Sequence, residues 1–163
     1  MTEDALPPVD PLFLKETPIF GGLPDHVFSR LIAALRVVRA ETGTQIFAEG
    51  DVARCMFVVA EGELEICKRG RNGAEFCLAV LGRGDCVGEM SLIDIQSRSA
   101  SARALSATLL YMLSQAEIAK LYETDLEGYV LLISNIAREI SRRLRYAGQV
   151  LVDMGVALQG SFG

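Results

Sequence analysis

Residues 88–102 read Gly-Glu-Met-Ser-Leu-Ile-Asp-Ile-Gln-Ser-Arg-Ser-Ala-Ser-Ala, and the rest of the chain is best understood outward from this stretch. A strand is predicted to end at Gly88, a short helical turn covers about residues 89–93, and a loop then leads to Arg98. Glycine lets the backbone approach a ligand closely, and the free N–H groups at the start of a helical turn attract anions. The stretch therefore predicts an anion-binding cradle.

The side chains give this cradle a positive end and a negative end. Arg98 supplies a bidentate positive fork, Ser99 adds a hydroxyl group, and Ala100 is too small to obstruct a ligand. Glu89 beside an anion would be repelled unless it faced a different group, such as a pair of sugar hydroxyls. In a nucleotide, the phosphate would pair with the arginine and the ribose hydroxyls would pair with the carboxylate, so the two charged ends match the polarity of a nucleotide. A plain surface loop with the same residues remains the alternative on spacing alone.

Short runs of β-forming residues lie on both sides of the cradle, separated by Gly, Asn and Asp. This cadence predicts an antiparallel β-roll or jelly-roll barrel, within a fold that is α+β and mainly β. The clearest hairpin turn is residues 69–73, because Gly and Asn accept positive φ. The expected strands are residues 45–48, 55–60, 64–68, 75–81, 101–106 and 109–114.

Helical periodicity flanks the strands. Residues 1–16 contain three prolines and are expected to be a flexible lead-in with at most a short helix. Asp25 is expected to cap a helix that runs to about Val38. Residues 17–124 would form the β-roll with its flanking helices, including a short helix at 115–122. Residues 125–158 would form one long helix, and residues 159–163 would form a tail.

The long helix carries an unbroken heptad seam of apolar residues. A helix of this length spans about 50 Å and overhangs a domain of this size. Its distal half is therefore expected to pack against a second copy in a parallel homodimer, with packing onto its own barrel as the alternative. The seam consists of Ile133, Ala137, Ile140, Leu144, Ala147, Leu151, Met154 and Leu158.

Composition excludes several classes of function. The uninterrupted apolar runs, such as residues 129–133, are far shorter than the ~20 residues of a membrane span. A net charge of −5 argues against direct nucleic-acid binding. The single histidine, His26, is expected to face solvent and excludes multi-histidine metal sites and most enzymes on jelly-roll barrels. The cysteines match no zinc spacing and are expected to be buried free thiols in a reducing cytoplasm: Cys55, Cys67, Cys77 and Cys86.

The pattern of Gly-Glu-Met-Ser-Leu-Ile, four residues, then Arg-Ser-Ala-Ser-Ala closely resembles the phosphate-binding cassette of cyclic-nucleotide-binding domains in the catabolite activator superfamily. Residues 17–23, 46–51, 58–64 and 81–85 are similar to further landmarks of that family, in the same order. The long terminal helix resembles the dimerising helix of its regulators. The match spans roughly residues 17–155.

The resemblance implies a role for each position of the cassette. Glu89 would accept hydrogen bonds from the ribose 2′-hydroxyl, and Arg98 would pair with the cyclic phosphate. Ser99 permits either cyclic AMP or cyclic GMP, and Arg142 or Arg143 would cap the base, with a solvated helix flank as the alternative. The full set of expected ligand contacts is Gly88, Glu89, Met90, Ser91, Arg98, Ser99, Ala100, Arg142 and Arg143.

We therefore predict a stand-alone, non-catalytic sensor of cyclic AMP or cyclic GMP, without a cofactor, whose long helix moves on binding. Only five residues follow Leu158, so no helix-turn-helix is expected in this chain. The output of a stand-alone sensor would pass to a protein partner, and a fragment that lacks its output domain is the alternative. A second alternative is a degenerate domain that serves as a dimerisation or protein-docking module.

Overall fold

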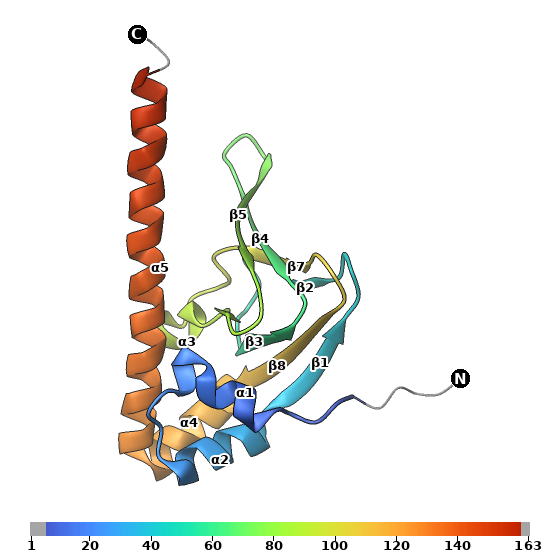
Figure 1. Ribbon diagram of the computed structural model, residues 1–163, viewed down its shortest axis with the longest axis vertical. Coiled ribbons are helices and arrows are strands. Elements are labelled where there is room, and N and C mark those ends of the chain that lie inside the picture. Colours follow the sequence, from blue (N-terminus) through green and yellow to red (C-terminus); the bar gives the residue numbers. More distant parts are fainter. Residues whose placement is uncertain (1–5, 161–163) are drawn as a thin grey trace, which may run out of the picture.

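The protein is described here by a computed structural model covering residues 6–160, and the side chains of residues 6–158 (Figure 1). Two antiparallel sheets of four strands form a β-roll, with orders β1-β8-β3-β6 and β2-β7-β4-β5. This confirms the predicted fold class. The strands are β1 (Arg36–Ala40), β2 (Gln45–Phe47), β3 (Cys55–Glu61), β4 (Leu64–Arg69), β5 (Glu75–Leu81), β6 (Cys86–Val87), β7 (Ser101–Ala104) and β8 (Thr108–Ser114).

All six predicted strands are present, and β1 and β6 are additional. The helix predicted to reach Val38 is wrong at its end, because α2 (Asp25–Ala34) stops four residues earlier. Val37 and Val38 instead pair with Tyr111 and Leu110 of β8. Helical spacing of apolar residues extends across this boundary, but β-branched valines suit a strand that can pair with a distant partner.

The other helices lie at one end of the roll and along its side. They are α1 (Pro11–Glu16), the 3-10 helix η1 (Pro18–Phe20), α3 (Met90–Asp94), α4 (Gln115–Thr124) and α5 (Leu126–Gly160). Asp10 caps α1 by accepting from the backbone N–H groups of Leu12 and Phe13. The cap predicted at Asp25 is wrong, since Pro24 occupies that position and Asp25 lies in the first turn.

Parts of the expected terminal segments belong to helices. Residues 11–16 of the expected lead-in form α1, whose Leu14 is fully buried. Residues 159–160 of the expected tail continue α5, whereas 1–5 and 161–163 lie outside the described residues. Within residues 6–160, none of the helices is both long and apolar enough to cross a membrane.

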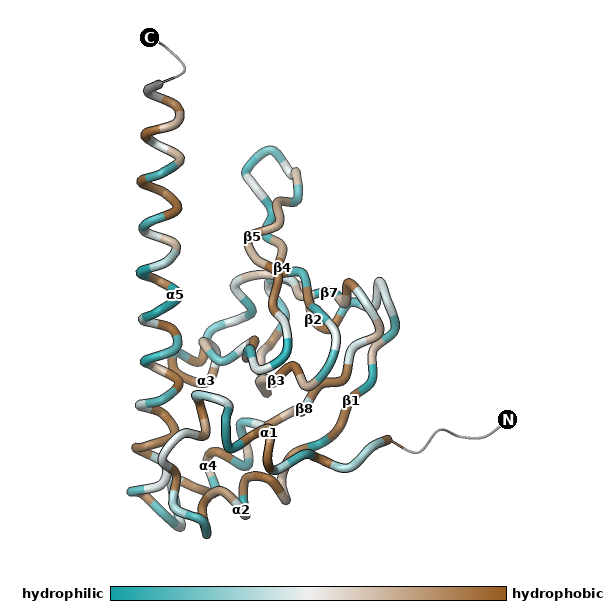
Figure 2. Tube along the Cα trace, viewed as in Figure 1, coloured by the Kyte–Doolittle hydropathy of each residue, from teal (hydrophilic) through white to brown (hydrophobic). Residues whose placement is uncertain are grey.

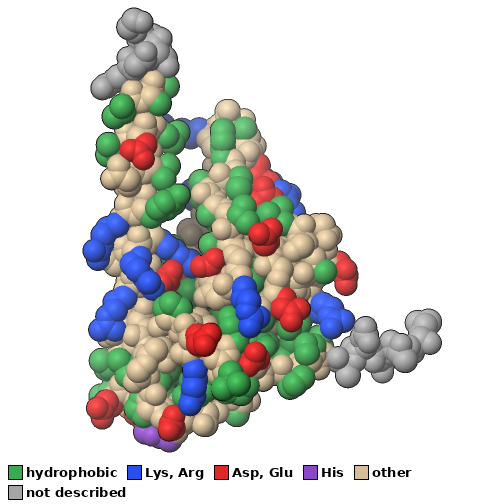
Figure 3. Space-filling model, in the orientation of Figure 1, with side chains coloured by type: hydrophobic (Ala, Val, Ile, Leu, Met, Phe, Trp, Pro, Cys, Tyr) green, Lys and Arg blue, Asp and Glu red, His purple; other side chains and the backbone are tan. Residues whose placement is uncertain are grey.

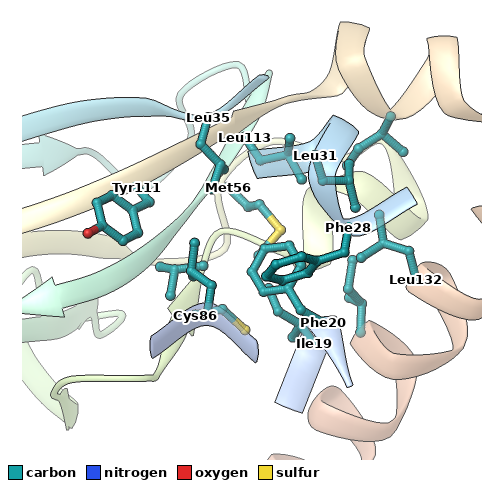
Figure 4. Close-up of a cluster of buried hydrophobic side chains, with 14 of the residues drawn as sticks. Ile19, Phe20, Phe28, Leu31, Leu35, Met56, Cys86, Tyr111, Leu113 and Leu132 are labelled. Carbon is teal, nitrogen blue, oxygen red and sulfur yellow. The ribbon is translucent and has the colours of Figure 1, made fainter. Parts of the chain in front are cut away.

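A large apolar cluster joins the helices to the β1-β8-β3-β6 sheet, while a second cluster fills the roll itself. Figure 4 shows Leu113 of the sheet beside Leu31 of α2, and Phe20 and Phe28 between Met56 and Leu132 of α5, all within one cluster. Figure 2 shows apolar residues on β8 and on the helices at the base of the molecule, and also along the distal half of α5. The core therefore sits at the base of the molecule and anchors the first half of α5.

The two halves of α5 differ sharply in burial. Leu132 and Ile136 are completely buried, whereas Leu151 is 69% exposed and Leu158 is 62% exposed. Ile140 packs against the core, which places only the first part of the heptad seam on the protein's own barrel. The distal half rises beyond the core beside the β4–β5 hairpin (Figure 1).

The cysteines are free, but they are not uniformly buried. Cys67 and Cys86 are buried and Cys55 is half-buried, as expected of small apolar side chains. Cys77 is exposed, which contradicts the prediction, because β5 is the edge strand of its sheet. No group of three His, Cys, Asp or Glu side chains suited to a metal ion occurs in the described part of the chain.

Candidate functional site

The predicted cradle lies between β6 and β7. The helical turn expected at residues 89–93 is α3, displaced by one residue to Met90–Asp94. Gly88 has a φ of 79°, and a Cβ there would lie 2.1 Å from Nη1 of Arg98. Only glycine therefore fits this position, both for its backbone conformation and for the space that the guanidinium occupies.

Arg98 is 5% exposed, and its guanidinium is held by neutral groups. Its Nη1 donates to the carbonyl oxygen of Gly88 at 3.1 Å, and its Nη2 donates to that of Cys55 at 2.7 Å. The Phe47 ring lies beneath it, 4.1 Å from the guanidinium carbon to the ring centroid. Nε is buried and has no hydrogen-bond partner among the described residues. The site therefore presents a buried positive charge whose Nε donor is unpaired among the described residues.

The backbone around Arg98 is clamped by the turn that follows β2. The N–H of Gly50 donates to the carbonyl oxygen of Arg98, and the N–H of Arg98 donates to that of Asp51, both at 2.9 Å. Lys68 of β4 adds a side-chain bond to the carbonyl oxygen of Ser99 and an ion pair with Glu49 at 3.1 Å. These contacts from distant strands set the direction in which the arginine points.

Glu89 forms the opposite end of the site and already has a cationic partner. Its side chain is 5% exposed, and its Oε1 lies 3.0 Å from Nη1 of Arg143 on α5. Burial raises the pKa of Glu89, and the charge of Arg143 partly offsets that rise. Arg143 also contacts Glu139 on its own helix, at 3.2 Å from Nε to Oε1. The carboxylate therefore links the cradle to α5.

A pocket of about 520 Å³ lies between the cradle, the β4–β5 hairpin and α5. Figure 3 shows the corresponding hollow between the helix and the hairpin. Eight of the nine residues predicted to contact a ligand line it: Gly88, Glu89, Met90, Ser91, Arg98, Ser99, Ala100 and Arg143.

Arg142 is the predicted residue that the structure does not bring to this pocket. It forms an ion pair with Glu139 and lines grooves beside Pro18 instead. Successive residues of an α-helix are rotated by about 100°, so adjacent arginines face different surfaces. The heptad position of Arg143 places it beside the seam, but it does not show whether Arg142 or Arg143 lines the pocket.

The remaining lining is mostly apolar and was not recognised in the sequence. Phe47 and Lys68 lie in predicted strands, where alternation indicates a face but not a pocket. The wall opposite the cradle combines hairpin residues with the middle of α5. Its apolar members include Ile66, Leu78, Leu81, Ile140, Leu144 and Ala147.

This arrangement can bind a ligand with three kinds of surface. The buried arginine matches an anion, the glutamate matches hydroxyl donors, and the apolar wall matches a flat ring system. The pocket volume is within the range of about 300–1,000 Å³ that is usual for small-molecule sites. His26, the sole histidine, lies outside it and pairs with Asp125 at 2.7 Å. The site is therefore of the nucleotide-binding class.

Comparison with known proteins agrees with this class. Residues 37–125 match the family model of the cyclic nucleotide-binding domain. The cyclic AMP receptor protein of Thermus thermophilus is 33% identical over 134 residues, covering 82% of this chain and 60% of that protein.

Two solved structures are also similar. The regulatory domain of Toxoplasma gondii protein kinase A, crystallised with cyclic AMP, has a TM-score of 0.64 at 28% identity over 68% of this chain and 42% of that one. A cyclic nucleotide-binding domain from Methylobacillus flagellatus has a TM-score of 0.79 at 23% identity, and the match covers 87% of this chain and 83% of that one. At this identity the similarity is evidence for the fold alone.

The chain therefore belongs to the cyclic nucleotide-binding domain family, since the family match covers more than half of its length. It spans about 60% of the length of the Thermus receptor protein.

Proposed function

We propose that this chain binds a 3′,5′-cyclic nucleotide reversibly, without catalysis or a cofactor, in the pocket between the cradle and α5. The observation that carries the proposal is the buried Arg98 guanidinium, whose Nε has no partner among the described residues. A cyclic phosphate supplies the acceptor and the negative charge that this group lacks. Relatives named for cyclic AMP support that nucleotide as the first ligand to test.

Binding would involve both ends of the pocket. Ribose hydroxyls would donate to Glu89, which then shares its charge between the ligand and Arg143. The base would lie against the apolar wall that includes Leu144 and Ala147 of α5. The ligand acts as a signal to the extent that it binds one position of this helix more tightly than another. The proposed signal therefore passes from the roll to α5.

Isothermal titration of dialysed protein with cyclic AMP and then cyclic GMP tests the proposal directly. We expect saturable micromolar or tighter binding, and a loss of about thirty-fold or more for Arg98→Ala, because a buried anion loses its cation. Arg83→Ala is a matched control, since Arg83 also lies over a phenylalanine ring and donates to a carbonyl oxygen, but outside the pocket.

The outcome also decides between this function and a degenerate docking module. Unchanged affinity in Arg98→Ala would contradict the role assigned to the arginine. Absence of binding to either nucleotide, after mass spectrometry has excluded nucleotide carried through purification, would favour the docking module.

We further propose that the chain forms a parallel homodimer through the distal seam of α5. The exposed apolar side chains of Leu151, Met154 and Leu158 support this arrangement. Leu151→Lys should convert a dimer at micromolar concentration into a monomer in equilibrium sedimentation. Val152→Lys is the matched control, because Val152 is 59% exposed but lies off the seam. A wild-type monomer under these conditions would contradict the proposal.

We infer that the module works in the cytoplasm and passes its signal to a protein partner. Its free cysteines are consistent with a reducing compartment.

A further inference from the structure

A second groove lies against α5, outside the nucleotide pocket. It has a volume of about 460 Å³ and is bounded on one side by Pro18 of η1. The charged residues that line it are all cations, namely Arg138, Arg142 and Arg145. Figure 3 shows Lys and Arg side chains gathered along this part of the helix. The groove is thus positively charged on a chain whose net charge is −5.

Two of these arginines are held by neutral partners. Nη1 of Arg138 donates to Oδ1 of Asn135 at 2.8 Å, and Nη2 of Arg145 donates to Oγ of Ser141 at 3.1 Å. Asn135 is itself buried, and its Nδ2 donates to the carbonyl oxygens of Ile19 and Gly21. The groove therefore has a buried polar residue at its base and two guanidinium groups that form no ion pair within the described residues.

The groove faces away from the heptad seam. Positions 138, 142 and 145 follow one another at spacings of four and three, so they lie on one face of the helix. At about 100° per residue, that face lies roughly opposite Leu144 and Leu151 of the seam. A second copy bound along the seam would therefore leave the three arginines accessible.

We propose that this arginine groove binds a carboxylate-rich segment of a partner protein. Guanidinium groups pair with carboxylates in a fixed fork geometry, and three of them here span about 10 Å along the helix. A peptide with two or three acidic side chains fits that spacing. A nucleic acid fits poorly, because its phosphates would extend past three arginines on a chain whose net charge is −5.

The groove is connected to the nucleotide pocket through Glu139. One carboxylate oxygen of Glu139 contacts Arg142 in the groove, and the other contacts Arg143, which in turn holds Glu89. An acidic partner that draws Arg142 away from Glu139 strengthens the bond from Glu139 to Arg143. Arg143 then holds Glu89 less tightly, which frees the carboxylate for ribose. This coupling, which rests on the proposed nucleotide binding, makes partner and nucleotide favour one another.

Fluorescence anisotropy of the full chain with a fluorescein-labelled peptide of alternating Glu and Ala tests the groove. We expect submillimolar binding at low salt that weakens as the salt concentration rises. The double variant Arg138→Gln with Arg145→Gln should bind about tenfold more weakly. The control double variant Arg36→Gln with Arg71→Gln, at exposed arginines elsewhere, has the same net charge and should bind like the wild type.

Equal weakening in both double variants, or no saturable binding of the peptide, overturns the groove as a partner site. Tighter binding of a single-stranded oligonucleotide than of the peptide overturns the choice of partner.

The coupling is tested by repeating the titration with saturating cyclic AMP. The nucleotide should tighten peptide binding about fivefold in the wild type and leave it unchanged in Glu139→Gln. Independent binding of both ligands to the wild type overturns the coupling while the groove stands. If cyclic AMP does not bind at all, the proposed function fails, and the peptide titration still decides the groove.

Discussion

The two ends of the nucleotide pocket carry opposite charges and are built in opposite ways. Arg98 is buried among carbonyl oxygens and an aromatic ring, with no carboxylate bonded to it in the described part of the chain. Glu89 is equally buried but is already paired with Arg143. The positive end therefore offers an incoming anion a charge to which no carboxylate of the described residues is bonded. The negative end must share Glu89 between Arg143 and the ligand.

This difference assigns separate tasks to the two ends. A buried charge without a counter-ion is costly, so an anion that reaches Arg98 recovers a large interaction energy. Ribose hydroxyls that reach Glu89 gain less, because they compete with an existing ion pair. That competition extends to α5, where Arg143 lies. We thus expect the Arg98 end to dominate affinity and the Glu89 end to transmit binding to the helix.

The most severe disruption of the positive end should come from Gly88→Ala. The new Cβ would stand where Nη1 of Arg98 lies, and the positive φ adds strain of about 1–2 kcal/mol. Nucleotide affinity should fall by about 2–5 kcal/mol, as in Arg98→Ala, and thermal stability should fall as well. Gly155→Ala, in an open part of α5, should instead stabilise the helix by about 1 kcal/mol.

Calorimetric titration and thermal unfolding of both glycine variants measure these effects. Nucleotide binding by Gly88→Ala at wild-type affinity would show that the guanidinium does not need its present position.

An intermediate effect is expected at the negative end from Glu89→Gln. Loss of a charged acceptor should weaken nucleotide binding by about 1.5–3 kcal/mol. The same variant changes the pH dependence of folding, because burial raises the pKa of Glu89 above its ordinary value of 4.5. At a pH between the ordinary pKa of the unfolded state and the raised pKa of the native state, the native state binds more protons than the unfolded state. The free energy of unfolding therefore falls as pH rises through this range.

Denaturant unfolding of the wild type and Glu89→Gln, from pH 4 upward, measures that contribution. The wild type should lose stability relative to the variant as pH rises from about 4.5 toward the raised pKa. A difference that stays constant with pH would show that Arg143 fully compensates the burial.

The smallest effect is expected from Phe47→Leu, which removes the ring beneath Arg98 but keeps an apolar side chain. The cation–π contact contributes about 0.5–2 kcal/mol, so affinity should fall several-fold. Phe57→Leu is a control that removes the ring stacked on Phe47 without touching the arginine. Equal losses in the two variants would assign the effect to packing of the roll.

Much of the site could be predicted from the sequence because the cradle is local. Gly88, Glu89 and Arg98 lie within eleven residues, and their turn chemistry and charge pattern are sufficient to predict two opposite ends. The cadence of strands and turns likewise determined the β-roll, and helical periodicity determined α5. Turn chemistry and helical period depend on residues close in the chain, whereas the pairing of the strands joins segments that lie far apart in it.

Only the tertiary structure decided how distant segments meet. β1 is a strand because β8, more than sixty residues away, pairs with it, and local periodicity predicted a helix there instead. The rotation of α5 against the roll places Arg143 in the pocket and Arg142 in the arginine groove. That no carboxylate of the described residues is bonded to Arg98 likewise depends on which strands surround it. Long-range packing sets these relations, because helix rotation and strand pairing depend on partner surfaces that local sequence does not encode.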